Sequence, residues 1–133
     1  MKAGKAWLAA IIIATMAPGG PLAGSAMAQS ASAVEAGQRI FIRCSACHSL
    51  SAAARPLLGP HLEGVVGRKV ASVPGYNYST QLQAKKFDWT EAQLDSLLKR
   101  PQAIAPGLCL PFTGLASAAD RKALIAYLKQ PLP

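Results

Sequence analysis

The most informative stretch of the 133-residue sequence is Cys44-Ser45-Ala46-Cys47-His48. Two thiols separated by two residues and followed directly by an imidazole form the attachment signature of a c-type haem. The two cysteines can add to the two vinyl groups of one porphyrin, because one helical turn supplies roughly the separation that those groups need. His48 is then held beneath the ring, where a neutral imidazole nitrogen can bind the iron. The motif therefore predicts one covalently bound haem c with His48 as an iron ligand.

A Cys-x-x-Cys pair also occurs in thioredoxin-like redox sites and in zinc sites. A zinc site needs four ligands, and after residue 28 the chain offers only one further histidine, His61, and one further cysteine, Cys109. A redox pair needs a βαβ setting, and the sequence shows no alternation of strand and helix patterns. Both alternatives are therefore weaker than haem attachment.

Residues 1–28 have the pattern of a secretory signal peptide. Two lysines precede an apolar run over residues 7–17, and Ala26-Met27-Ala28 offers a small-x-small cleavage site. The run is about eleven residues, shorter than the roughly 18–20 that a membrane span needs, and an uncleaved anchor is the alternative. We therefore expect cleavage after Ala28, export to a periplasm, and a mature chain that is not stably inserted in a membrane.

The expected mature chain, residues 29–133, has the length of one small domain. The whole sequence carries 14 basic and 6 acidic residues, and two of the lysines fall in the leader. A positive protein of this size can meet nucleic acid, an anionic membrane or an acidic protein. We expect no nucleic-acid partner, because the chain is exported and has no basic patch with interleaved aromatic residues. An acidic redox protein is the better candidate for a partner.

Three capping boxes predict the main helices of an all-α domain. In each, a serine or threonine is followed three residues later by an acidic or amide residue: Ser32-x-x-Glu35, Thr90-x-x-Gln93 and Ser117-x-x-Asp120. The first helix is expected to run into the haem motif, the second to stop at Pro101 and the third at Pro131. A short helix after Ser79 is also compatible with the sequence. No segment alternates for long enough to predict a strand.

Residues 49–78 contain three prolines and four glycines and show no sustained periodicity. An irregular segment of this length is unusual inside a compact domain. A haem resolves the conflict, because a loop wrapped around the porphyrin buries its apolar residues on the ring.

Beyond the haem motif, the order and spacing of many residues resemble those of class I cytochromes c. The shared elements, which cover nearly all of residues 29–133, are Gly37-x-x-x-Phe41-x-x-Cys44-x-x-Cys47-His48, Gly59-Pro60-x-Leu62-x-Gly64-Val65-Val66-Gly67-Arg68, Tyr78, Trp89-Thr90-Glu91, Pro106-Gly107, Phe112-x-Gly114 and Leu124-Ile125-Ala126-Tyr127-Leu128. The resemblance implies a small cytochrome c fold, with three main helices and long loops around one covalently attached haem. It also implies packing of Phe41 against the last helix, and an electron carrier rather than an enzyme.

The resemblance assigns roles to single residues around the haem. The carbonyl of Pro60 would accept a hydrogen bond from His48, which fixes the tautomer of the imidazole. Arg68, Tyr78 and Trp89 would surround a buried haem propionate. The phenol and the indole would act as donors, and the guanidinium would offset the negative charge.

The sequence departs from this family at the sixth iron ligand. The family loop reads Pro-Gly-x-x-Met-x-Phe-x-Gly, whereas here Leu110 stands at the methionine position, two residues before Phe112. The distal haem contacts implied by the resemblance therefore come from Leu110 and Phe112. Met1, Met16 and Met27 all fall in the leader, so methionine ligation is excluded for the mature protein.

Several groups could fill the sixth position. Cys109 is adjacent, and a thiolate is a strong ligand for ferric iron that lowers the potential, although the family's loop course would point its side chain away. His61 is poorly placed, because it follows Pro60 on the His48 side of the ring. Water, or an open five-coordinate iron walled by Leu110, is the other option. Cys109 can instead be a simple thiol or link two otherwise monomeric chains.

The leading hypothesis is a periplasmic one-electron carrier with atypical iron ligation. The alternative is a binding protein or sensor whose open iron holds carbon monoxide, nitric oxide or a small anion. A weak peroxidase-like side activity is a third hypothesis, although the distal loop shows no histidine or arginine placed as an acid–base helper. Steering charge for an acidic partner could come from five basic residues, Lys69, Lys85, Lys86, Lys99 and Arg100.

Overall fold

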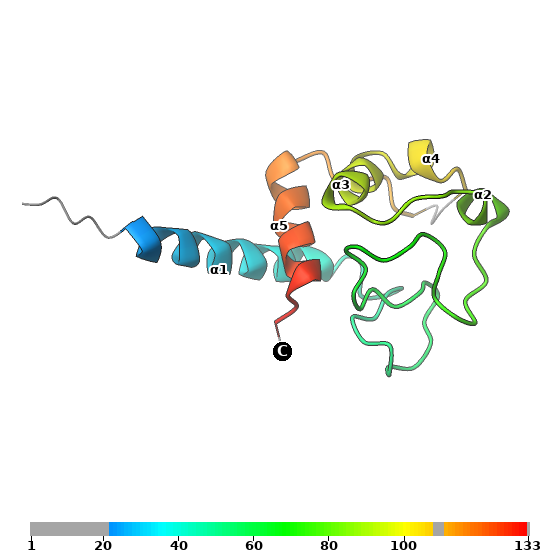
Figure 1. The fold of residues 1–133 in the computed structure, drawn as a ribbon, viewed down its shortest axis with the longest axis horizontal. Helices are drawn as coiled ribbons and strands as arrows, with labels where there is room; N and C mark the ends of the chain where they lie inside the picture. Colours follow the sequence, from blue (N-terminus) through cyan, green and yellow to red (C-terminus); the bar gives the residue numbers. More distant parts are fainter. Residues whose placement is uncertain (1–21, 108–110, 133) are drawn as a thin grey trace, which may run out of the picture.

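The computed structural model describes residues 22–107 and 111–132. Its helices, in chain order, are α1 (Leu22–Phe41), α2 (Thr80–Gln83), α3 (Glu91–Lys99), α4 (Pro101–Ile104) and α5 (Ala118–Lys129) (Figure 1). The one extended pairing within these residues is an isolated antiparallel bridge between Lys69 and Asp88. None of the helices in the described part of the chain is long and apolar enough to cross a membrane. The predicted all-α fold class is confirmed.

The helices from the two ends of the chain, α1 and α5, make the most extensive helix–helix contact in the described structure. Figure 1 shows α5 crossing α1 near the C-terminal end of α1. Gly37 lies at this crossing, because a Cβ atom there would be 2.1 Å from the carbonyl oxygen of Ala123. Beside it, the rings of Phe41 and Tyr127 pack with their centroids 5.7 Å apart, as the resemblance implies. A small residue at position 37 therefore sets how closely the two helices approach.

The capping residues expected for the later helices are confirmed. The side-chain oxygens of Ser79, Thr90 and Ser117 each accept a hydrogen bond from a backbone N–H in the first turn of the helix that follows. Helix α3 also carries Glu91 in its first turn and Lys99 in its last, where each charge complements the helix dipole.

One helix boundary differs from the sequence-based expectation, and one short helix was not expected. Helix α1 begins at Leu22 rather than after Ser32, whose hydroxyl donates to the carbonyl of Gln29 inside the helix. The residues upstream are rich in alanine, which has the highest helix propensity, so the helix extends past the expected cap. Pro101 does not only follow α3 but also begins α4, where its missing N–H costs nothing and its fixed φ suits the first helical turn.

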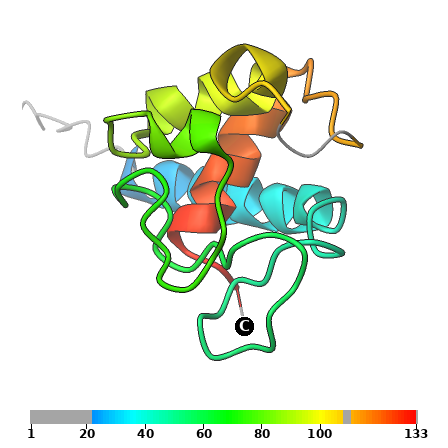
Figure 2. The same ribbon diagram turned by 90° about the vertical axis from the view of Figure 1, so that its right-hand side faces the viewer.

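Residues 42–79 form a long irregular segment, which includes the one that the sequence predicts over residues 49–78. In both views this segment lies apart from α3 and α4, on the side of the molecule where the chain ends (Figures 1 and 2). Val65 and Val70 of this segment are buried and join the same hydrophobic cluster as the helices. The irregular segment is therefore attached to the helical part through a shared core.

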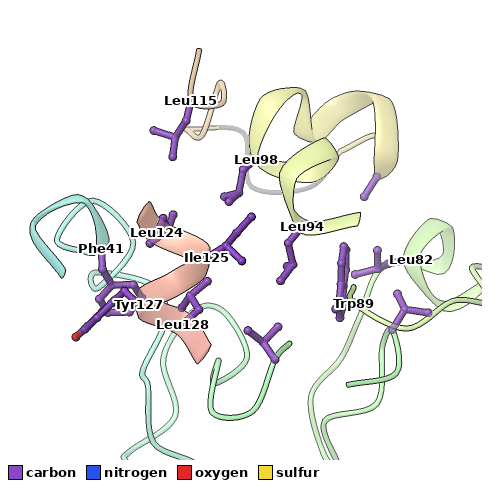
Figure 3. Packing of buried hydrophobic residues seen from close by; sticks show 13 residues of the cluster. Phe41, Leu82, Trp89, Leu94, Leu98, Leu115, Leu124, Ile125, Tyr127 and Leu128 are labelled. Carbon is purple, nitrogen blue, oxygen red and sulfur yellow. The ribbon is translucent and has the colours of Figure 1, made fainter. Parts of the chain in front are cut away.

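That core extends from the helix crossing to the short helix α2. Figure 3 shows Phe41 beside Tyr127 at one end of the cluster and Trp89 beside Leu82 at the other. Between them lie apolar residues of α3 and α5, namely Leu94, Leu98, Leu124, Ile125 and Leu128. This arrangement fixes the irregular segment at both of its ends.

Candidate haem site

The cysteine–histidine motif lies in the turns that follow α1. After the helix ends at Phe41, the N–H groups of Cys47 and His48 both donate to the carbonyl of Cys44, at 3.0 and 2.9 Å. These hydrogen bonds wind the motif into one helical turn. Both cysteine side chains are half-buried. The two thiols are therefore separated by a single turn and stand at the edge of the core.

The imidazole of His48 is oriented by residues of the long segment. Its Nδ1 donates to the carbonyl of Pro60 at 2.8 Å, which is the hydrogen bond that the resemblance implies. Because Nδ1 carries the proton, Nε2 keeps the lone pair that a metal ion needs. Gly59 packs directly against the ring, since a Cβ atom there would lie 2.3 Å from Cε1 of His48.

Residues 58–60 form a short strap along this imidazole. The N–H of Gly59 donates to the carbonyl of Cys47 at 2.7 Å, and the phenol of Tyr76 donates to the carbonyl of Leu58 at 2.9 Å. The sequence alone indicates no role for Gly59 or Tyr76. The Gly59-Pro60 pair is visible in the sequence, but the contact with Tyr76 arises only when the loop folds back.

Arg68 and Trp89 are neighbours through their backbones. The N–H of Trp89 donates to the carbonyl of Arg68 at 2.8 Å, and the indole is buried. The guanidinium of Arg68 donates to the carbonyls of Glu63 and His61 at 2.8 and 2.9 Å. Burial lowers the pKa of Arg68, while the nearby Tyr78 acts in the opposite direction. The structure therefore gathers Arg68, Trp89 and Tyr78 in one region.

The loop over residues 106–114, which we call the distal loop, is described except for residues 108–110. Cys109 and Leu110 lie outside the described residues. Phe112 is half-buried and packs against the core cluster. The N–H of Leu115 donates to the carbonyl of Leu98 at 2.7 Å, which ties the end of the loop to α3.

A buried arginine of α5 also holds the end of this loop. Arg121 is only 5 % exposed, and its Nε donates to the carboxylate of Asp95 at 2.7 Å. Its Nη1 donates to the carbonyls of Leu115 and Ala116 at 3.0 and 2.8 Å. The sequence alone does not indicate this role for Arg121, because an arginine in an amphipathic helix is ordinarily exposed.

The second histidine of the chain, His61, lies beside Arg68, which donates to its carbonyl at 2.9 Å. Its Nδ1 is buried and has no hydrogen-bond partner among the described residues. Within residues 22–107 and 111–132, no three histidine, cysteine, aspartate or glutamate side chains form a group that could hold a metal ion.

The residues present fit a covalently attached haem. Cys44 and Cys47 stand one helical turn apart, and the imidazole of His48 follows with Nε2 left for a metal. Gly59 leaves the space that this imidazole occupies. A helical domain with a long loop around such a motif defines a small c-type haem protein, in which the haem takes up and releases one electron.

Comparison with known proteins identifies the family. The cytochrome c family matches residues 34–131, and the chain belongs to this family. The chain is 39 % identical to cytochrome c2 of Rhodomicrobium vannielii over 112 residues, which cover 80 % of this chain and 90 % of the relative. It is 42 % identical to cytochrome c-554 of Methylosinus trichosporium over 95 residues, which cover 71 % and 72 % of the two chains. It is 38 % identical to cytochrome c-550 of Nitrobacter winogradskyi over 97 residues, which cover 73 % and 89 %.

Membership in this family defines the general activity. The protein is a monohaem electron carrier rather than an enzyme, and it acts with redox partners. One haem c is bound covalently through Cys44 and Cys47.

Proposed function

We propose that this cytochrome works in the periplasm as a one-electron carrier whose iron has no methionine ligand. The observation that carries this proposal is Leu110 at the methionine position of the family loop, in a chain with no methionine in residues 29–133. Leucine has no lone pair and does not bind iron. Because thioether ligation favours ferrous iron, its loss lowers the midpoint potential of the haem.

The proposed location rests on residues 1–28 acting as a signal peptide that is removed after Ala28. Export also agrees with the chemistry, because covalent haem attachment in bacteria takes place outside the cytoplasm. Helix α1 continues from Leu22 across this position in the uncut chain, so cleavage would shorten the helix well before the crossing at Gly37. The intact mass of protein purified from the periplasm tests the proposal. A start at Gln29 supports it, and a membrane-bound chain that keeps the leader contradicts it.

The proposed haem contacts follow the geometry of the site. Nε2 of His48 would bind the iron, and the hydrogen bond to Pro60 would raise the basicity of the imidazole. Arg68, Tyr78 and Trp89 would hold one propionate, since a buried carboxylate needs both donors and an opposite charge. The proposed distal contacts are Leu110 and Phe112.

Binding of a small ligand at an open sixth position is the alternative function. The apolar side chain of Leu110 favours it, because it would wall the iron without occupying it. A Cys109 thiolate on the iron would favour electron transfer instead. Pairing of Cys109 between two chains would give a dimer in place of the expected monomer.

Absorption spectra of the purified holoprotein distinguish the two functions. The ferric and ferrous forms are recorded with and without carbon monoxide, for the natural sequence and for Cys109→Ala. If the natural protein does not bind carbon monoxide, a strong internal ligand occupies the sixth position, which supports electron transfer. Rapid, tight binding that Cys109→Ala leaves unchanged indicates an open iron and supports the alternative.

The proposed partner is an acidic redox protein. Without the two lysines of the leader, the chain carries 12 basic and 6 acidic residues, and this net charge of +6 supports the partner. Lys99 and Arg100 are exposed at the end of α3. Charge steering raises association rates and weakens with salt on the scale of a Debye length of roughly 8–10 Å. The bimolecular electron-transfer rate should therefore fall as salt rises. An electron-transfer rate that stays constant from low to high salt would contradict electrostatic docking.

A further inference from the structure

Residues 29–32 form an exposed start of the mature chain when the leader is removed after Ala28. They belong to α1 and are exposed in the structure, whereas the next residue, Ala33, is half-buried. Val34 is the first of the described residues to pack against the hydrophobic core. The beginning of the mature chain is therefore held by the hydrogen bonds of α1 rather than by the core.

Cleavage changes the chemical state of Gln29. In the uncut chain its nitrogen is a peptide nitrogen inside α1, and its carbonyl accepts a hydrogen bond from the hydroxyl of Ser32 at 2.9 Å. After cleavage this nitrogen becomes a primary amine on the first residue of the shortened helix. The first N–H groups of a helix have no carbonyl one turn upstream to accept from them, so the backbone of α1 no longer fixes the amine. The amine and the exposed side chain of Gln29 can then turn toward each other.

The charge at the start of the shortened helix favours a reaction that removes this amine. The N-terminal end of a helix carries a partial positive charge, so an ammonium group there is unfavourable. Residues 29–32 read Gln-Ser-Ala-Ser and contain no carboxylate that would compensate it. Part of the amine is unprotonated near neutral pH, and this form is a nucleophile. The carboxamide of the same residue is the nearest electrophile along the chain.

We propose that Gln29 is a modification site, at which the mature chain closes to an N-terminal pyroglutamate. The amine nitrogen attacks Cδ of the side-chain carboxamide, so the N–Cδ bond forms and the Cδ–Nε2 bond breaks. Nε2 leaves as ammonia and takes the proton that the amine gives up. The ring consists of N, Cα, Cβ, Cγ and Cδ, and its closure needs no oxidant, reductant or co-substrate.

The proposal rests on the proposed cleavage after Ala28, because only a chain that begins at Gln29 has the reacting amine. Every other glutamine keeps a peptide nitrogen after the cut, including Gln38 within α1 and Gln130 at the end of α5. A peptide nitrogen is a poor nucleophile because its lone pair is delocalised into the carbonyl group. The reaction is therefore confined to one residue of the chain.

The lactam would protect the exposed part of α1. An aminopeptidase recognises the free amine of its substrate, and pyroglutamate has none. A chain with a free amine could lose residues 29–32 one by one, since they do not pack against the core. Ring closure also removes a positive charge from the start of the helix, as N-terminal acetylation does. The modification would thus preserve both the length and the stability of the first turn.

The intact mass of holoprotein taken from the periplasm tests the proposal. The natural protein is compared with Gln29→Ala, which cannot close the ring, and with Gln130→Ala, which removes an exposed glutamine at the other end of the chain. Each mass is measured at harvest, after incubation at neutral pH, and after treatment with an aminopeptidase. We expect the natural protein and Gln130→Ala to be lighter by one ammonia than a chain with a free amine at position 29, and to resist trimming. Gln29→Ala should keep its full mass at harvest and lose residues from positions 29–32 on treatment.

A second enzyme checks the chemical nature of the blocked end. Pyroglutamyl peptidase should remove one residue from the natural protein and make it a substrate for the aminopeptidase. A natural protein that begins at Gln29 with its full mass would overturn the ring closure and leave the proposed cleavage intact. A loss of ammonia that appears only during incubation, or that also occurs in Gln29→Ala, would overturn it as well. A chain that begins at another residue would contradict the cleavage itself, and the modification with it.

Discussion

The side chain of His48 occupies the space that any Cβ atom on Gly59 would need, because such an atom would lie 2.3 Å from Cε1 of the imidazole. The same imidazole donates to the carbonyl of Pro60, the next residue in the chain. The missing side chain of Gly59 thus leaves space for the imidazole of His48, and the carbonyl of Pro60 sets the orientation of the ring.

Gly59→Ala should therefore disturb the iron ligand itself. The added methyl group pushes the imidazole away and lengthens the hydrogen bond to Pro60. We expect a loss of about 1–3 kcal/mol in the free energy of unfolding, the usual cost of overpacking, together with a changed haem spectrum. Gly64→Ala is the control, because Gly64 has φ +62° but open space around it. It should destabilise the protein through its backbone and leave the spectrum unchanged, and an equal spectral change in both variants would refute this view.

Arg121→Met should cost about 2–4 kcal/mol in the free energy of unfolding, because it leaves Asp95 without its cation and two loop carbonyls without their donor. Lys129→Met is the matched control. Its ion pair with Glu91 is short, 2.6 Å, but both side chains are about half exposed. Such a pair contributes at most about 1 kcal/mol. Urea unfolding of the two holoproteins measures the difference, and equal losses would show that the burial of Arg121 has no energetic effect.

The sequence predicts best where the physics is local. Thr90 and Ser117 cap their helices as expected, because a cap depends on only a few neighbouring residues. Ser32 fails as a cap, since helix-forming residues upstream compete with it. The packing of Phe41 against Tyr127 could be predicted from the resemblance to the family.

Contacts made across the irregular segment could not be predicted from the sequence. Neither the link from Tyr76 to Leu58 nor the gathering of Lys69 with Lys85 follows from any periodicity, because both depend on how a loop folds back. The burial of Arg121 was missed for the same reason: its partners lie in α3 and in the distal loop.

Replacing both motif cysteines by serine should prevent stable holoprotein from forming. Cys44→Ser/Cys47→Ser removes both thioether bonds, and a haem that binds only the folded chain contributes stability only while it is bound. We expect no haem stain on a denaturing gel and a large loss of folded protein. A normal stain with a cooperative melt would refute covalent attachment at these residues.

Leu110→Met tests the proposed absence of a methionine ligand. Leucine and methionine have similar volumes, so the exchange should cost less than about 1.5 kcal/mol. If residue 110 lies over the iron, the new sulfur binds it and raises the midpoint potential by about 0.1 V or more. Carbon monoxide binding should slow as well, because a ligand must now be displaced. A variant with unchanged potential and unchanged ligand binding would show that residue 110 is not above the haem.

The close approach of Gly37 to Ala123 makes the completeness of the chain a condition for folding. The two residues stand near opposite ends of the domain, so their contact closes a loop that contains almost everything else, and closing it costs chain entropy. Cys44 and Cys47, in contrast, sit just after α1, far from α5 in the sequence. A chain that stops short of α5 would therefore keep every haem-attaching residue and still lack the partner of its first helix. Such fragments should be degraded rather than accumulate as partly active cytochrome.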